Sequence, residues 1–94
     1  MDEALKERIR TALKEACAPD TAEVSLDDDM GWNRVGGTVI SHRFDQMAPS
    51  HRQDLICKRL DAALDAGERT LVTFILTLTP AENEELGGAQ AHAG

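Results

Sequence analysis

The sequence is poor in aromatic residues and in positive charge. Trp32, Phe44 and Phe74 are its only Trp and Phe residues, and Tyr is absent. So few aromatic side chains offer little surface for stacking nucleic-acid bases. The 94 residues include 17 Asp and Glu but only 10 Lys and Arg, for a formal net charge of −7. Nucleic acids and anionic membranes are bound by clustered Lys and Arg, so both are disfavoured as partners, although a local basic patch remains open.

The chain also lacks a long hydrophobic run and a set of cysteines. No stretch approaches the ~20 apolar residues that a membrane-spanning helix needs. Residues Met1–Lys14 alternate charged and apolar side chains, so we expect no signal peptide. Cys17 and Cys57 are the two cysteines, which is too few for a disulfide framework. These features predict a reduced, cytoplasmic setting without membrane contact.

A helix is predicted over Asp2–Ala18. Its apolar residues recur at spacings of three and four and form one stripe. The stripe consists of Leu5, Ile9, Ala12, Leu13, Ala16 and Cys17. Asp2 is expected to cap the helix start, and Pro19 is expected to stop the helix. Because Cys17 falls on the stripe, we interpret it as a core residue rather than a reactive thiol.

Two strands are predicted to follow. Thr21–Asp27 alternates apolar and polar residues, which is typical of a half-buried strand. Val35–His42 forms the second strand, and its Gly36-Gly37 pair indicates a bulge or a weak entry. The short polar segment between the two strands favours an antiparallel hairpin.

A second helix is predicted from about Pro49 or Ser50 to Ala66. Either Ser50 forms a capping box with Gln53, or Pro49 is the first helical residue. Gly67 is expected to end the helix. The apolar face should consist of Leu55, Ile56, Leu60, Ala63 and Leu64.

The strongest strand pattern covers Thr70–Thr79. We expect alternate residues to share a face, with Val72, Phe74, Leu76 and Leu78 together on one side. Thr79-Pro80-Ala81-Glu82 then predicts a helix start, with Thr as the cap, Pro in the first position and Glu three residues after the cap. We expect this helix to be short and residues 87–94 to form a flexible tail.

This order of elements predicts one α+β domain over residues 1–86. Its expected architecture is a two-layer sandwich of αββαβ order, in which helices cover one face of a three-stranded mixed sheet. Because a helix joins the last two strands, these should pair in parallel with a right-handed crossover.

Candidate metal sites are weak. A calcium loop that starts at Asp27 would need Glu at its twelfth position, where the chain has Thr38. His42, His51 and His92 lack the spacing of zinc ligands, and no CxxC motif accompanies them. We therefore expect no bound metal.

Candidate catalytic residues are equally sparse. Ser50, His51 and Cys57 are the only nearby nucleophile and base candidates, and neighbouring helical residues point apart. We therefore expect a protein that is not an enzyme. Trp32 lies in the predicted hairpin turn, where it either folds over the sheet or forms an exposed contact anchor that Arg34 could extend.

Several of these features together resemble the BolA-like family. The resemblance covers about Leu5 to Glu82 and rests first on the αββαβ order. It rests also on Val39-Ile40-Ser41-His42-Arg43-Phe44, followed eight residues after Phe44 by Arg52, and on Leu78-Thr79-Pro80-Ala81-Glu82. It implies a fold related to the type-II KH arrangement and a partnership with monothiol glutaredoxins that share an iron–sulfur cluster. For some members it also implies a role in stress response or as transcriptional regulators.

The chain departs from the family at the positions that carry this chemistry. The family's Arg-His-Arg reads Arg52-Gln53-Asp54 here, and its cluster-ligating His aligns with Leu71. The hairpin loop, Asp28–Gly36, contains neither Cys nor His. Since Leu cannot ligate iron, we expect no cofactor of the chain's own, and a cluster shared with a partner is disfavoured.

We therefore predict a protein-interaction domain, either a monomer or a weak homodimer, whose partner resembles a monothiol glutaredoxin. The predicted partner-binding residues are Trp32, Arg34, Phe44, His51, Arg52 and Arg69. The alternative is a nucleic-acid-binding transcriptional regulator. That alternative rests on the fold relation and on the local bases Arg43, Arg52, Lys58, Arg59 and Arg69.

Overall fold

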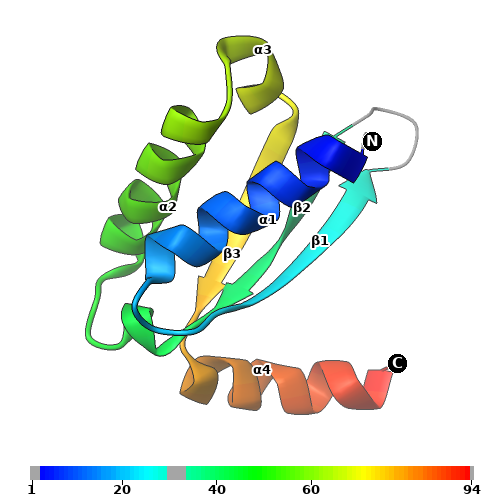
Figure 1. The fold of residues 1–94 in the computed structure, drawn as a ribbon. Helices are drawn as coiled ribbons and strands as arrows, with labels where there is room; N and C mark the ends of the chain where they lie inside the picture. The colour runs from blue at the N-terminus through cyan, green and yellow to red at the C-terminus, as the bar shows by residue number, and fades with distance from the viewer. Residues whose placement is uncertain (1–2, 30–33, 94) are drawn as a thin grey trace.

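The computed structural model describes residues 3–29 and 34–93, and Figure 1 shows its fold. Its elements in chain order are α1 (Glu3–Cys17), β1 (Glu23–Asp29), β2 (Arg34–Ile40), the short helix η1 (His42–Phe44), α2 (Pro49–Ala63), α3 (Ala66–Arg69), β3 (Val72–Leu78) and α4 (Pro80–Ala93). Two predicted features, the Asp2 cap and the turn at Trp32, lie outside the described residues.

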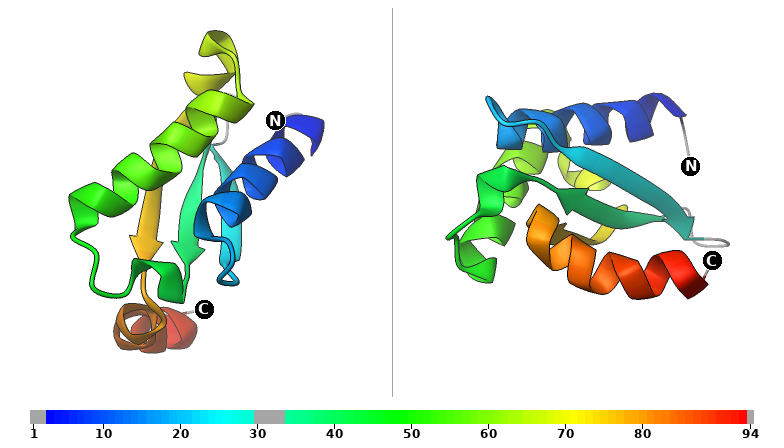
Figure 2. Two further views of the ribbon diagram at one scale, coloured as in Figure 1. Left: turned by 60° about the vertical axis from the view of Figure 1, so that its left-hand side comes forward. Right: turned by 90° about the horizontal axis from the view of Figure 1, so that it is seen from below.

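The three strands form one mixed sheet in the order β1-β2-β3. β1 pairs with β2 in antiparallel fashion, and β2 pairs with β3 in parallel. α1 and α2 lie together on one face of this sheet (Figures 1 and 2). The predicted α+β sandwich with its mixed sheet is therefore confirmed.

α1 supplies one half of the core. All six of its predicted apolar positions are buried, and Ile9, Leu13 and Cys17 have no exposed surface. Burial raises the pKa of the Cys17 thiol, because the thiolate would lose its hydration there. The interpretation of Cys17 as a core residue is confirmed.

α2 supplies the other half of the core, with a narrower apolar face than predicted. Ile56, Leu60 and Leu64 are buried. Leu55 is only half-buried and Ala63 is exposed. Pro49 occupies the first turn and Ala48 is the N-cap without a side-chain hydrogen bond, so the second of the two predicted helix starts is the correct one.

The prediction that Gly67 ends this helix is wrong. α2 already ends at Ala63, and Leu64 adopts an extended conformation. Asp65 then caps the short helix α3, since its carboxylate accepts from the N–H of Glu68 at 2.7 Å while the Glu68 carboxylate accepts from the N–H of Asp65 at 3.1 Å. Gly67 lies inside α3. This reciprocal cap starts α3 at Ala66. Gly67 therefore lies in a new helix and cannot mark the end of α2.

A bulge in β3 changes which side chains face the helices. Val35 pairs with Val72, but Gly37 pairs with Ile75, so β3 has one more residue than β2 over this stretch. Val72 and Ile75 therefore both belong to the core beneath the helices, whereas Phe74 does not. The prediction that Val72 shares a face with Phe74 is wrong for this reason.

The irregularity predicted at Gly36-Gly37 is confirmed, since the pairing of β2 with β3 shifts register between Val35 and Gly37. Close packing explains why both residues are glycine. A Cβ on Gly37 would collide with the carbonyl oxygen of Ser25 on β1. A Cβ on Gly36 would lie 2.5 Å from Thr73 Oγ1 on β3. Both neighbouring strands thus approach β2 more closely at these positions than a side chain permits.

α4 lies on the opposite side of the sheet from α1, as the right panel of Figure 2 shows. Its start is the predicted capping box: Thr79 Oγ1 accepts from the N–H of Glu82 at 3.1 Å, and the Glu82 carboxylate accepts from the N–H of Thr79 at 2.9 Å. The helix continues to Ala93, so the prediction that it is short is wrong, while the flexibility of residues 87–94 stays a prediction. No helix within the described residues is long and apolar enough to cross a membrane.

Candidate interaction site

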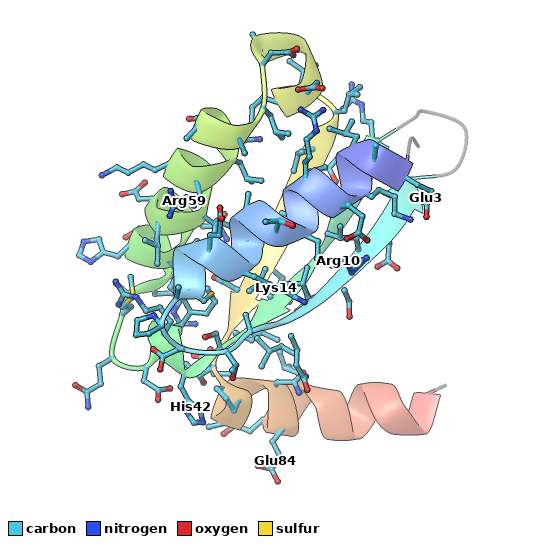
Figure 3. All side chains as sticks on the ribbon, in the orientation of Figure 1. Glu3, Arg10, Lys14, His42, Arg59 and Glu84 are labelled. Atoms are coloured by element: carbon cyan, nitrogen blue, oxygen red, sulfur yellow. The ribbon has the colours of Figure 1, made fainter. Side chains whose placement is uncertain are left out.

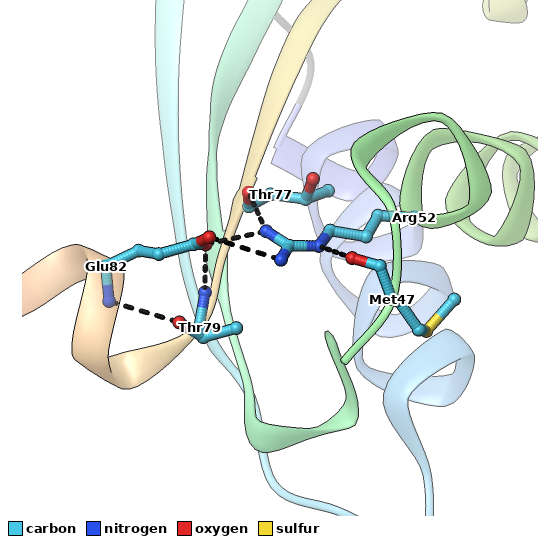
Figure 4. Close-up of polar contacts among 5 residues, drawn as sticks. All are labelled: Met47, Arg52, Thr77, Thr79 and Glu82. Atoms are coloured by element: carbon cyan, nitrogen blue, oxygen red, sulfur yellow. Dashed lines mark hydrogen bonds and ion pairs between the residues drawn. The ribbon is translucent and has the colours of Figure 1, made fainter. Parts of the chain in front are cut away.

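Arg52 joins four segments of the chain at the end of β3 where α4 begins (Figure 4). Its Nε donates to the carbonyl oxygen of Met47 at 3.0 Å, and its Nη1 donates to that of Thr77 at 3.3 Å. Nη1 and Nη2 together bind the Glu82 carboxylate at 2.6 and 3.2 Å. The guanidinium also lies 5.9 Å from the centre of the Phe44 ring. Arg52 thus fixes the start of α2 and the start of α4 to the same point of the sheet.

This network determines the ionisation of Glu82. The bidentate hydrogen bond from Arg52 is the main cause that lowers the pKa of Glu82 to about 2, and the N–H of Thr79 adds to the effect. Glu82 therefore carries its charge throughout the physiological range, and Arg52 balances that charge.

Two of the predicted partner-binding residues are buried. Phe44 is 0% exposed and Arg52 is 6% exposed. Phe44 therefore has no exposed surface with which to contact a partner, and that part of the prediction is wrong. Arg52 is mostly buried, but it lines the groove described below, so its contact with a partner stays a prediction.

The other predicted residues lie at two different ends of the sheet. Arg34 begins β2, and Arg69 lies just before the parallel strand β3, so both are at the end of the sheet where these strands start. His51 is exposed on the first turn of α2, beside the other end of β3. Arg69 donates to the Asp61 carboxylate at 2.9 Å. Trp32 lies outside the described residues, so its role stays a prediction.

Two of the predicted basic residues are already engaged within the domain. Arg52 and Arg69 are each paired with a carboxylate, while Arg59 lies on α2 (Figure 3) and is exposed. The alternative function in nucleic-acid binding therefore gains no support from these residues and stays a prediction.

Sequence reasoning missed an apolar groove of about 550 Å³ between the start of α2, β3 and the start of α4. Phe74, Leu76 and Leu78 line it from β3, and Leu86 lines it from α4. Exposure of the three β3 residues rises with distance from α4: Leu78 is 6% exposed, Leu76 is half-buried and Phe74 is 66% exposed. α4 thus covers only one end of this face.

Phe74 and Leu86 are the large apolar side chains that remain exposed among those that the structure describes, at 66% and 48%. Phe74 lies on β3 and Leu86 on α4, and both side chains line the groove. Contiguous exposed apolar surface of this kind is typical of contact sites. We name this surface, formed by Phe74, Leu76, Leu78 and Leu86, the open-face groove.

The outer edge of β3 beside the groove is partly occupied by side chains of α2. The carbonyl oxygen of Leu78 accepts from the N–H of Ser41, the residue that follows β2, so the carbonyls of Ile75 and Thr77 point away from β2. Gln53 Nε2 donates to Ile75 O at 2.8 Å, and Arg52 donates to Thr77 O. These contacts protect an edge that would otherwise be open to strand pairing.

Metal and cluster chemistry has little support in this arrangement. Among residues 3–29 and 34–93, no group of three or more His, Cys, Asp or Glu side chains is placed to hold a metal ion. Leu71, at the position of the BolA-like cluster ligand, is partly buried against the core. No family model and no curated protein matches the chain.

Proposed function

We propose that this chain is a non-catalytic protein-interaction domain of the BolA-like kind that binds its partner through the open-face groove. The observation that carries the proposal is that Phe74 and Leu86, both large and exposed, line one groove. Exposed apolar side chains that line one groove are a feature of protein contact sites and ligand-binding grooves.

A monothiol glutaredoxin is the proposed partner, and the cytoplasm is the proposed location. The partner follows from the resemblance in element order and in the Phe44-to-Arg52 and Leu78-to-Glu82 segments. Because Leu71 replaces the family's ligating His, the proposed contact depends on side-chain packing rather than on a shared cluster. The location follows from the use of two unpaired cysteines, of which Cys17 is buried.

Co-expression with a monothiol glutaredoxin from the same genome tests this proposal. Size-exclusion chromatography should show a complex with the wild type, without any requirement for iron and glutathione, and should show its loss with Phe74→Ser. Glu15→Lys, on the exposed side of α1, is the matched control and should leave the complex intact. Absence of a complex both with and without iron and glutathione would reject the glutaredoxin assignment.

A further inference from the structure

We infer that the open-face groove accepts an amphipathic helix whose apolar face is flanked by Lys or Arg; this inference rests on the proposed function. The groove is bounded by the start of α2, by β3 and by the start of α4, which gives it two helical walls. Its base is the row Phe74, Leu76 and Leu78. Apolar side chains at helical spacing could lie along this row, as in other helix-in-groove contacts.

Charge decides what kind of segment fits. Within the described part of the chain, the charged residues that line the groove are Arg52, Glu82 and Glu85. Arg52 and Glu82 neutralise each other through their bidentate pair, so Glu85 is the exposed carboxylate that no side chain described in the structure balances. A basic flank on the partner would be attracted to this rim.

The same charge disfavours the other macromolecular occupants. A second copy would have the same acidic rim, and each copy carries a net charge of −7. The two copies would therefore repel each other. Phosphates of nucleic acid or of anionic lipid would likewise meet Glu85 first, because the one guanidinium in the groove is already engaged.

The hydrogen bonds around the groove favour a helix over an added strand. A strand that paired with β3 would need the outward carbonyls of Ile75 and Thr77, and these already accept from Gln53 and Arg52. A helix makes its own backbone hydrogen bonds and needs only apolar contact and charge from the groove.

Two designed peptides of about 15 residues test the inference. Both carry Leu at i, i+3, i+4 and i+7, and their remaining positions are mainly Lys in one peptide and Glu in the other. Fluorescence anisotropy should show that the wild type binds the Lys peptide and not the Glu peptide. Phe74→Ser and Leu86→Ser should each weaken binding of the Lys peptide by about tenfold.

A charge-matched pair of variants separates the groove from general attraction. Glu85→Lys and Glu15→Lys change the net charge equally, but only Glu85 lines the groove. Glu85→Lys should weaken binding of the Lys peptide by about threefold or more beyond the effect of Glu15→Lys. Circular dichroism should show that all four variants are folded, as expected for exposed side chains.

The possible results are decisive in different ways. Equal binding of both peptides, or equal effects of Glu85→Lys and Glu15→Lys, would overturn the inferred basic flank. Undiminished binding by both Phe74→Ser and Leu86→Ser would overturn the groove as the site. If the wild type fails to bind the Lys peptide and still forms a glutaredoxin complex that Phe74→Ser abolishes, the helix inference fails and the proposed function stands.

Discussion

The two faces of the sheet differ in how completely they are covered. On one face, α1 and α2 bury Ile9, Leu13 and Val39 without any exposed surface. On the other face, α4 covers Leu78 but leaves Phe74 66% exposed. The bulge in β3 connects these outcomes, because it turns Val72 into the core and leaves Phe74 outside. The comparison teaches that the first face stabilises the fold, while the second retains apolar surface for contact.

Substitution of the two phenylalanines should give the largest difference in free energy of unfolding between the two faces. Phe44→Ala should lower the free energy of unfolding by about 3–5 kcal/mol, since it removes a fully buried ring. Phe74→Ala should lower it by about 1 kcal/mol or less, because most of that side chain is already in water. Urea unfolding followed by circular dichroism measures both changes. Equal losses would contradict the assignment of the two residues to different roles.

The second largest expected change in stability comes from the close contact of β1 with β2. Gly37→Ala should cost about 2 kcal/mol, because the new methyl group collides with the Ser25 carbonyl oxygen in the backbone of β1. Gly67→Ala is the matched control, since its Cβ would meet only Asp65 Oδ1 at an ordinary 3.5 Å. It should be neutral or stabilising by up to about 1 kcal/mol, because alanine restricts the unfolded chain. Thermal melting should place Gly37→Ala below the wild type and Gly67→Ala at or above it.

The ion pair of Arg52 and Glu82, which joins the two faces, should make the smallest contribution to stability. This contribution should depend on pH. The pKa of Glu82 is lowered in the folded state to about 2 from an ordinary 4.5. Its contribution to stability is therefore fully present above pH 4.5 and is lost as the pH falls towards about 2. Because the Glu82 side chain is 42% exposed, the contribution should be about 1 kcal/mol or less.

Glu82→Gln tests this dependence, since Gln can still complete the capping box but carries no charge. The wild type should lose more stability than Glu82→Gln between pH 5 and about pH 2. Glu15→Gln, on α1, should follow the acid unfolding profile of the wild type. Identical profiles for all three proteins would show that the Arg52–Glu82 pair does not couple α4 to the sheet.

The sequence was a good guide wherever local pattern alone sets the structure. The apolar stripe of α1 is buried as predicted, and Thr79 and Glu82 form the predicted cap, because each depends on residues three or four apart. The mixed sheet followed from the order of elements. Gly67 misled because the local cap of Asp65 and Glu68 is the stronger signal.

Long-range packing explains what the sequence could not predict. Val72, Phe74, Leu76 and Leu78 are all apolar, so strict alternation looked plausible in β3. The Gly36-Gly37 pair in β2 indicated an irregularity, but nothing in the β3 pattern showed that the extra residue lies between Val72 and Ile75. Arg52 was predicted as a contact residue from the resemblance to the BolA-like family. Its burial could not be predicted, because its acceptors, the Met47 and Thr77 carbonyls, come from separate segments. The groove needed Leu86, which lies in a helix that was expected to be short.

Mapping of backbone amide chemical shifts by NMR, with the Leu/Lys peptide added, tests the central claim most directly. The open-face groove predicts the largest shifts at Phe74, Leu76, Glu85 and Leu86, with those of α1 unchanged. The same titration on Phe74→Ser should abolish the shifts. Shifts concentrated on α1 or on the outer side of α2, with β3 and α4 unaffected, would contradict the assignment of partner binding to this face.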